Sequence, residues 1–213
     1  MMKAHNPTET RSRLLDAASD VIRAKGYAAT TVDDICAATG MTKRAFFHHF
    51  ESKERLGLAA IEQFEAPAAA IFGSAPYAAD PDPRERVFGY LDFRAAMLLP
   101  GDVAQYACLM GTTVQEVYNT HSDLRAACHR GMSEHVAELT LDIEAARAGY
   151  APDAPWSAQS VGCFMQVVLQ GAFVFAKAKQ DSKVALESLA HLRRYLEPIL
   201  GQPLDQPQRE QQS

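Results

Sequence analysis

The sequence lacks the segments that would carry the chain into or across a membrane. Its 213 residues contain no uninterrupted apolar run of the about 20 residues that a bilayer-spanning helix needs. The N-terminal segment MMKAHNPTETRSR has no apolar stretch of the kind found in a signal peptide. We therefore predict a cytoplasmic protein with no membrane partner.

Cysteine is scarce, and its spacing argues against cysteine-based sites. The four cysteines lie far apart and form no C-x-x-C pair; they are Cys36, Cys108, Cys128 and Cys163. Such spacing predicts neither a zinc site nor a redox motif. Reduced, buried thiols are expected instead, and no cofactor is predicted.

Signatures of catalysis are missing as well. The sequence has no G-x-S-x-G, P-loop or G-x-G-x-x-G pattern. A di-metal helical bundle needs Glu-x-x-His motifs on separate helices, whereas His135 and Glu138 form a single pair in the reverse order. We therefore do not expect an enzyme; a helical hydrolase or carboxylate-bridged metalloprotein is the alternative that elemental analysis for metal would test.

Positive charge is not spread over the chain. The formal net charge is -5, but the first 60 residues carry nine Lys and Arg against seven Asp and Glu, while the other residues carry twelve against nineteen. This distribution disfavours an architectural DNA-binding protein, which needs broad positive charge to neutralise phosphates. Any contact with DNA must come from the N-terminal quarter.

The pattern that is present is helical almost throughout. Apolar residues recur at intervals of three and four, and no strand-like alternation is found. We predict an all-α fold of about nine helices, with an N-terminal tri-helical domain at residues 9–56 and a larger helical domain at residues 57–200. The polar ends at residues 1–8 and 201–213 are expected to be disordered. A break between the two domains is expected at the segment PYAADPDPRE, which lies among four prolines between Pro67 and Pro83.

Local capping signals divide the N-terminal domain into short helices. A first helix from Thr8 ends at Gly26, which tolerates positive φ. Thr31, with Asp34 three residues later, opens a second helix of about two turns. After a turn, Thr42 caps a third helix, KRAFFHHF, and Ser52 then caps a longer one. Two short helices joined by a turn after a longer helix predict a helix-turn-helix.

The third helix has the two faces that a DNA-recognition helix needs. Ala45, Phe46 and Phe50 are expected to face inward, whereas Lys43, Arg44, His48 and His49 are expected to face outward. The Arg44 guanidinium matches guanine O6 and N7 and is the first choice for base readout, with Lys43 second. Contacts with phosphate are expected from Thr31, Thr42 and Lys53.

The segment TTVDDICAATGMTKRAFFHHFESKERL resembles the DNA-binding signature of the TetR family of repressors. The matching positions are Gly26-Tyr27, Thr31, Ile35, Gly40, Thr42, Phe46, His49, Phe50 and Lys53. Phe47 departs from the pattern, because many members have a phosphate-binding Tyr there; we expect Phe47 to pack against a sugar. Cys36 and Thr39 stand where Ala is usual, and both are small enough for the helix contact. The resemblance is motif-specific over residues 10–56, and it implies a homodimer with a ligand-binding helical body.

The body is expected to contain helices near residues 84–99, 103–110, 112–148, 157–179 and 182–200, with an interruption of the third at His121-Ser122. The helix at 157–179 is apolar almost all round, which a four-helix bundle between two subunits would explain. Gly162, Gly171 and Ala172 would allow close approach of helices. The second helix would contribute Leu189, Leu192, Leu196 and Leu200 to that interface. An intramolecular core is the other interpretation of the same pattern.

The resemblance also implies a pocket between the middle helices for a small-molecule inducer. Residues that mix apolar walls with sparse polar groups are nominated: Phe93, Met97, Cys108, Thr112, Gln115 and Phe164. Glu116 and Asn119 would orient the ligand if they turn inward. Plain core packing is the alternative for each of these residues.

The function predicted is a one-component transcriptional regulator, a repressor that binds a palindromic operator as a homodimer and is released by an inducer. Ligand binding would favour a state in which the helix at 52–66 swings, so that the two recognition helices no longer match major grooves about 34–36 Å apart. As an alternative signal, YACLMGTTVQEV resembles segments of electrophile-responsive or aldehyde-responsive members. A thiol at a helix start can react, so electrophile sensing through Cys108 is a further hypothesis.

Overall fold

The computed structural model describes residues 7–98 and 107–201, and in these residues every regular element is a helix. The predicted all-α fold is therefore confirmed. The elements are α1 (Pro7–Lys25), α2 (Val32–Thr39), α3 (Lys43–His49), α4 (Lys53–Gly73), the 3-10 helix η1 (Pro76–Ala79), α5 (Pro83–Leu98), α7 (Leu109–Val117), α8 (Ser122–Tyr150), α9 (Ala158–Lys179) and α10 (Lys183–Ile199). Predictions for residues 1–6, 103–106 and 202–213 fall outside the described residues, while Pro7 and Thr8 belong to α1 rather than to a disordered end.

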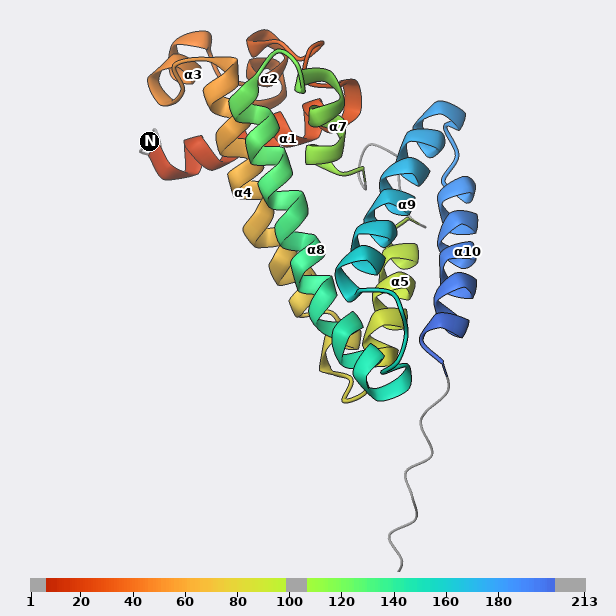
Figure 1. The fold of residues 1–213 in the computed structure, drawn as a ribbon. Helices are drawn as coiled ribbons and strands as arrows, with labels where there is room; N and C mark the ends of the chain where they lie inside the picture. Colours follow the sequence, from red (N-terminus) through yellow and green to blue (C-terminus); the bar gives the residue numbers. More distant parts are fainter. Residues whose placement is uncertain (1–6, 99–106, 202–213) are drawn as a thin grey trace, which may run out of the picture.

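The helices form two groups that share one long helix. Figure 1 shows α1, α2 and α3 gathered at one end of α4, while α5, α9 and α10 lie together at the other side of the molecule. The helix α8 contacts α4, α5, α7 and α9, and thus runs between the two groups. The interruption expected at His121 is confirmed, because α7 ends at Val117 and α8 begins at Ser122.

Two apolar clusters fill these groups. The N-terminal cluster combines side chains of α1 to α4, such as Leu14 and Phe46, with side chains that α7 and α8 supply from outside the first 60 residues. Those contributed side chains are Leu109, Met110, Val117, Leu124, Ala127 and Cys128. The body cluster joins α5, α9 and α10 to the C-terminal half of α8. Both clusters therefore include side chains of α8, and the predicted boundary at residue 57 falls inside α4.

The helix expected at 52–66 extends further, since α4 continues through Pro67 to Gly73, whereas the break expected at PYAADPDPRE is confirmed by η1 and the start of α5 at Pro83. A proline inside a helix removes one hydrogen bond and crowds the preceding turn, a cost of about 3 kcal/mol. Burial on both sides of Pro67 offsets this cost: Leu56 and Ile61 are buried in the N-terminal cluster, and Phe72 packs against the body cluster. The turn comes later, at Ser74 and η1.

The leucines of α10 serve the chain's own core rather than a partner. Leu189, Leu192, Leu196 and Leu200 are at most 3% exposed and belong to the body cluster. Their placement corrects the expectation that they form an intersubunit seam. The physical reason is that α10 packs on α9 and α5, and these contacts use its apolar stripe.

The helix α9 is apolar enough in composition and length to span a membrane, but packing within the protein explains part of this character. Met165, Leu169, Phe173 and Ala176 are buried in the body cluster. Gly162 also serves the internal packing, because a Cβ there would lie 3.2 Å from Thr140 Oγ1 on α8. Packing within the chain does not explain the apolar side chains on the opposite, exposed face of α9.

Candidate nucleic-acid interface and ligand cavities

The helix α2 is capped as its sequence predicts. Thr31 Oγ1 accepts a hydrogen bond from Asp34 N at 3.2 Å, and Thr31 N donates to Asp34 Oδ2 at 2.7 Å, so the capping box is complete. Lys25 Nζ lies 2.5 Å from the same carboxylate. This lysine and the Thr31 hydrogen bonds lower the pKa of Asp34. Gly40 ends α2 with φ of 69°, which is the left-handed conformation expected for this glycine.

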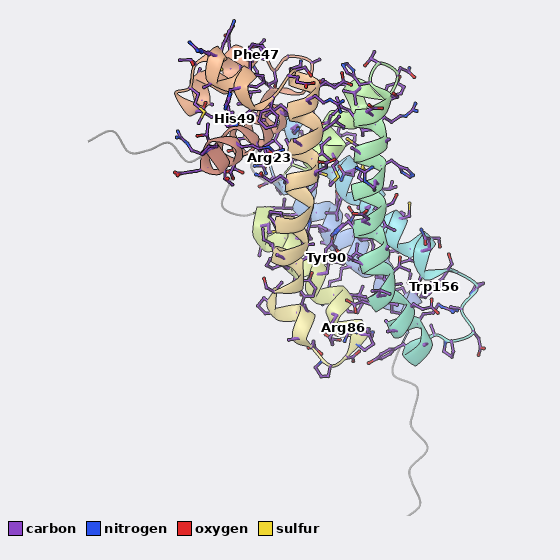
Figure 2. The ribbon with its side chains drawn as sticks, turned by 90° about the vertical axis from the view of Figure 1, so that its left-hand side faces the viewer. Arg23, Phe47, His49, Arg86, Tyr90 and Trp156 are labelled. Atoms are coloured by element: carbon purple, nitrogen blue, oxygen red, sulfur yellow. The ribbon has the colours of Figure 1, made fainter. Side chains whose placement is uncertain are left out.

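The helix α3 has the inner and outer faces that were predicted. Thr42 Oγ1 accepts from Ala45 N at 3.2 Å and caps the helix, while Phe46 is fully buried and packs against Phe50. Lys43, Arg44 and His48 are exposed. Phe47 is 54% exposed and lies at the outer end of the molecule (Figure 2). An exposed basic edge is therefore held on a rigid apolar base.

Two of the expected DNA-facing groups are partly engaged within the protein. Lys43 Nζ forms an ion pair of 2.9 Å with Asp33 of α2, and both side chains are well exposed. Exposed pairs of this kind contribute little, about 0–1 kcal/mol, so a phosphate or base can displace Asp33. The Thr31 hydroxyl donates to Asp34 Oδ2 at 2.6 Å, whereas the Thr42 hydroxyl accepts its cap bond and keeps its own hydrogen to donate.

His49 turns toward α1 rather than outward. It is half-buried, and it lines an open groove of about 460 Å³ between α3 and the start of α1 with Thr10, Arg44 and His48. Burial, with smaller contributions from His48 and Arg11, lowers the pKa of His49. Figure 2 shows His49 closer to α1 than Phe47 is. The outward position predicted for His49 is therefore corrected: periodicity alone did not reveal that α1 covers this edge of α3.

Lys53 has a positioning role in the structure. Its Nζ donates to Tyr27 O at 3.0 Å and to Thr30 O at 2.9 Å, and it lies 4.4 Å from the centre of the Tyr27 ring. Burial lowers the pKa of this ammonium group. The loop between α1 and α2 leaves carbonyl groups that no helix can satisfy, and Lys53 supplies the donor. We therefore replace the expected phosphate contact by a role in holding this loop.

Further polar contacts join the N-terminal unit to the body. Glu116 Oε2 on α7 accepts a hydrogen bond from Ala28 N at 2.6 Å. Lys177 Nζ on α9 donates to Arg23 O at 3.1 Å and to Thr112 Oγ1 at 2.8 Å. Burial lowers the pKa of Lys177. The C-terminal end of α1 and the following loop are thus tied to α7 and α9.

A cavity of about 350 Å³, which we call the junction cavity, opens beside these contacts. It lies between the end of α1, the helix α7 and the helix α9. Its lining includes Lys25, Gly26, Cys108, Thr112, Gln115, Glu116, Gln170 and Lys177. Four of the predicted ligand-binding residues therefore come together here, namely Cys108, Thr112, Gln115 and Glu116.

A second cavity of about 290 Å³, the inner cavity, lies deeper between α4, α5, α8 and α9. Its apolar wall includes Phe64, Ile71, Phe72, Met97 and Met110, and its polar residues are Arg23, Arg94, His135, Gln166 and Gln170. Cys108 and Gln170 line both cavities. Among the predicted ligand-binding residues, Met97 lines the inner cavity but not the junction cavity.

The other nominated residues lie elsewhere. Phe93 packs in an aromatic group with Phe72 and Tyr77, and it lines neither of the two cavities. Phe164 is 41% exposed on α9 and contacts Tyr195, so its assignment to the pocket is corrected. Asn119 is exposed beyond the end of α7 and does not turn inward.

The polar residues of the inner cavity were missed from the sequence, although a signal was present. Gln166 and Gln170 are polar residues four apart on a helix that is apolar almost all round, so they share one face. Gln166 Nε2 donates to Tyr90 OH at 3.0 Å, and that hydroxyl lies 3.0 Å from His135 Nε2. Burial lowers the pKa of His135 to about 4, so this imidazole is neutral at neutral pH.

Comparison with known proteins connects this architecture to gene regulation. The family model described as bacterial regulatory proteins, tetR family, matches residues 14–60, which span α2, α3 and parts of α1 and α4. The repressor NemR of Escherichia coli K12 is 20% identical over 195 residues, which cover 92% of this chain and 98% of NemR. The repressor DhaR of Mycobacterium sp. is 37% identical over 57 residues, or 27% of this chain and 29% of DhaR.

Solved structures share this fold over most of the chain. The reduced form of Escherichia coli NemR matches with a TM-score of 0.72 and 21% identity, over 87% of this chain and 96% of that one. A TetR-family regulator from Agrobacterium tumefaciens matches with a TM-score of 0.77 and 19% identity, over 89% and 98% of the two chains. The arrangement of the helical body is thus shared, while sequence similarity is concentrated in the helix-turn-helix.

Proposed function

Because this chain belongs to the TetR family of transcriptional regulators, we propose that it is a ligand-responsive repressor that binds a palindromic operator as a homodimer. The observation that carries the proposal is the exposed basic edge of α3, formed by Lys43, Arg44 and His48, on a unit that Glu116 and Lys177 tie to the junction cavity. These contacts would link the surface that reads DNA to the cavity that binds the ligand.

On DNA, α3 would enter the major groove with its exposed edge toward the bases. Arg44 would read guanine through two parallel hydrogen bonds, and Lys43 would leave Asp33 to contact a base or phosphate. Thr42 would donate its hydroxyl hydrogen to phosphate, and the exposed ring of Phe47 would pack on a sugar. His48 lies on the same edge and would approach the backbone.

The exposed face of α9 supports a homodimer. Phe164, Val167, Val174 and Phe175 are between 41% and 62% exposed, and a Cβ at Gly171 in their midst would meet no atom within 4 Å. Spacings of three and four place these residues on one face, and Tyr195 of α10 extends it. A two-fold axis over this face would join α9 and α10 of each subunit into a four-helix bundle.

Release from DNA would follow from a shift between two conformations. A ligand that occupies either cavity would contact the end of α1 or the helix α4 and would favour a different position of α1 and α4 against the body. The two recognition helices would then no longer match grooves about 34–36 Å apart. Operator affinity would fall although no residue of α3 changes its own structure.

Electrophile sensing through Cys108 is the second candidate, and one observation favours it. The Cys108 side chain lines both cavities, and its Sγ accepts a hydrogen bond from Gly111 N at 3.4 Å at the start of α7. A reagent that enters either cavity would therefore meet this thiol. Unchanged release of DNA by quinones or reactive aldehydes in the Cys108→Ser variant would rule out this mode.

Genomic binding-site selection with the purified protein would test the central proposal. We expect one palindromic sequence to be enriched, and fluorescence anisotropy should show that the Lys43→Ala, Arg44→Ala double variant loses selective binding to it. Arg130→Ala on the exposed side of α8 is the matched control. Selective binding that survives the double variant, or the failure of every duplex to bind, would contradict the proposal.

A further inference from the structure

The inner cavity carries positive charge that its described lining does not neutralise. Two arginines, Arg23 and Arg94, reach it, and no Asp or Glu occurs among the lining residues whose side chains the structure describes. Arg23 already forms a 2.5 Å ion pair with the exposed Asp20. No hydrogen bond or ion pair joins Arg94 to another residue of ranges 7–98 and 107–201. The charge that remains for a ligand is therefore that of Arg94.

Aromatic rings hold the Arg94 guanidinium in place without removing its charge. Its Cζ lies 5.3 Å from the centre of the Phe72 ring on α4 and 5.4 Å from that of Phe173 on α9. Stacking on ring faces leaves the in-plane N–H groups of a guanidinium available, and these groups match a carboxylate in a bidentate geometry. Arg94 is thus presented as a preorganised anion-binding group.

The other polar groups of the cavity are neutral. His135 is uncharged at neutral pH and is engaged with Tyr90, while Gln166 donates to the Tyr90 hydroxyl. Glu138, 3.6 Å from His135 Nδ1, lines a separate groove on the other side of the imidazole, together with Asp142. Among the described side chains, the acidic groups that could attract a cation therefore line that neighbouring groove rather than the inner cavity.

The rest of the cavity is apolar and small. Phe64, Ile71, Met97 and Met110 supply much of its wall, and its volume of about 290 Å³ is at the lower end of the range of ligand sites. A compact apolar body would fill this space, with one charged group placed at Arg94. A bulky or multiply charged ligand would not fit.

We infer that the effector of this protein is a compact amphipathic carboxylate whose apolar body fills the inner cavity and whose carboxylate pairs with Arg94. The inference rests on the proposed function, because it specifies the inducer class. It deepens that proposal by naming the charge of the ligand and the residue that selects it.

Calorimetric titration of the full-length protein with matched probes tests the inference. The first series is 2-naphthoate, its neutral analogue 2-naphthamide and the cation of 2-(aminomethyl)naphthalene; the second is octanoate with octanamide. We expect at least one carboxylate to bind about tenfold or more tightly than its amide, because a hydrogen bond to a charged partner is lost in the amide. The cation should bind most weakly.

Variants assign the preference to Arg94. Arg94→Gln should abolish the difference between carboxylate and amide, Arg94→Lys should keep part of it, and Arg130→Gln on the exposed side of α8 should leave it unchanged. Thermal unfolding of each variant checks that the fold is intact. A preference that persists in Arg94→Gln, an amide or cation that binds as tightly as the carboxylate, or no binding by either carboxylate would overturn the inference.

Operator release distinguishes this inference from the proposed function. If the amide or the cation binds and releases the selected operator while the carboxylates do not, the inducer class is wrong and the regulatory proposal stands. If a carboxylate binds through Arg94 but leaves operator affinity unchanged, the inferred ligand class stands and its role as inducer is contradicted.

Discussion

Lys177 of α9 donates a hydrogen bond of 3.1 Å to the main-chain carbonyl of Arg23, near the end of α1. The residues are 154 positions apart, so the contact joins the first helix of the N-terminal unit to a helix whose other face is exposed. A displacement of α9 along its axis would therefore either move the end of α1 or break this hydrogen bond.

Replacing Lys177 by Met should lower the free energy of unfolding by about 1–3 kcal/mol, because Arg23 O and Thr112 Oγ1 both lose a charged donor. Urea unfolding at one fixed protomer concentration measures the change. In a double-mutant cycle with Thr112→Val, the two substitutions should be non-additive. Lys179→Met, on an exposed residue of the same helix, is the control and should change stability by less than about 0.5 kcal/mol. Equal effects of the two lysine substitutions would refute the role of Lys177.

Gly26→Ala should destabilise the protein by about 2 kcal/mol. Gly26 has φ of 89°, and a Cβ there would collide with Glu116 Oε1, the carboxylate that binds Ala28 N. Adding Glu116→Ala should recover part of the loss, since it removes the collision but not the backbone strain. Gly149→Ala within α8 is the matched control, because no atom lies within 4 Å of its Cβ position, and it should be neutral or slightly stabilising. Thermal unfolding of the wild type and the three variants provides the comparison.

His135 should make stability depend on pH. Its pKa is lowered to about 4 in the folded state by burial, whereas an unfolded histidine titrates near 6.5. Protons bind the unfolded chain first, so stability should be highest above pH 6.5 and fall as the pH drops from 6.5 toward 4, by up to about 3 kcal/mol. His135→Gln should flatten this part of the pH profile of urea unfolding, and His129→Gln, on an exposed side chain, should not. Identical profiles for wild type and His135→Gln would show that another group is responsible.

The exposed face of α9 should hold the dimer together. Phe175→Glu, on a side chain that is 61% exposed, should produce monomers at micromolar concentration because a buried unpaired carboxylate at the interface is costly. Leu141→Glu on α8, where the leucine is 74% exposed, is the control and should leave the dimer intact. Sedimentation velocity distinguishes the two results. A dimer that tolerates Phe175→Glu would require a different interface.

The parts of the fold that local chemistry determines could be predicted from the sequence. Thr31, Thr42 and Ser52 cap the helices that they were expected to cap, and Gly26 and Gly40 adopt positive φ at helix ends. These outcomes depend on groups within a few residues of each other. The inward position of Phe46 follows from helical periodicity in the same way.

The errors arose where a distant partner decides the outcome. The continuation of α4 through Pro67 depends on the burial of side chains at both ends of α4. The ammonium group of Lys53 donates to carbonyl groups of a loop 23 to 26 residues earlier in the chain. Phe164 and Leu192 both have apolar side chains, but Phe164 lies on the exposed face of α9 whereas Leu192 is buried in the core. A single sequence does not specify which of two apolar stripes packs inside its own chain and which stays on the surface.

The sharing of α8 between two apolar clusters limits how the molecule can be dissected. Leu124, Ala127 and Cys128, together with Leu109 and Val117 of α7, complete the packing around Leu14 and Phe46. A fragment cut after residue 60 would leave that packing open on one side and expose its leucines to water. We therefore expect that the DNA-binding end does not fold by itself. A chimaera that joins it to another protein would need that protein to supply two helices equivalent to α7 and α8.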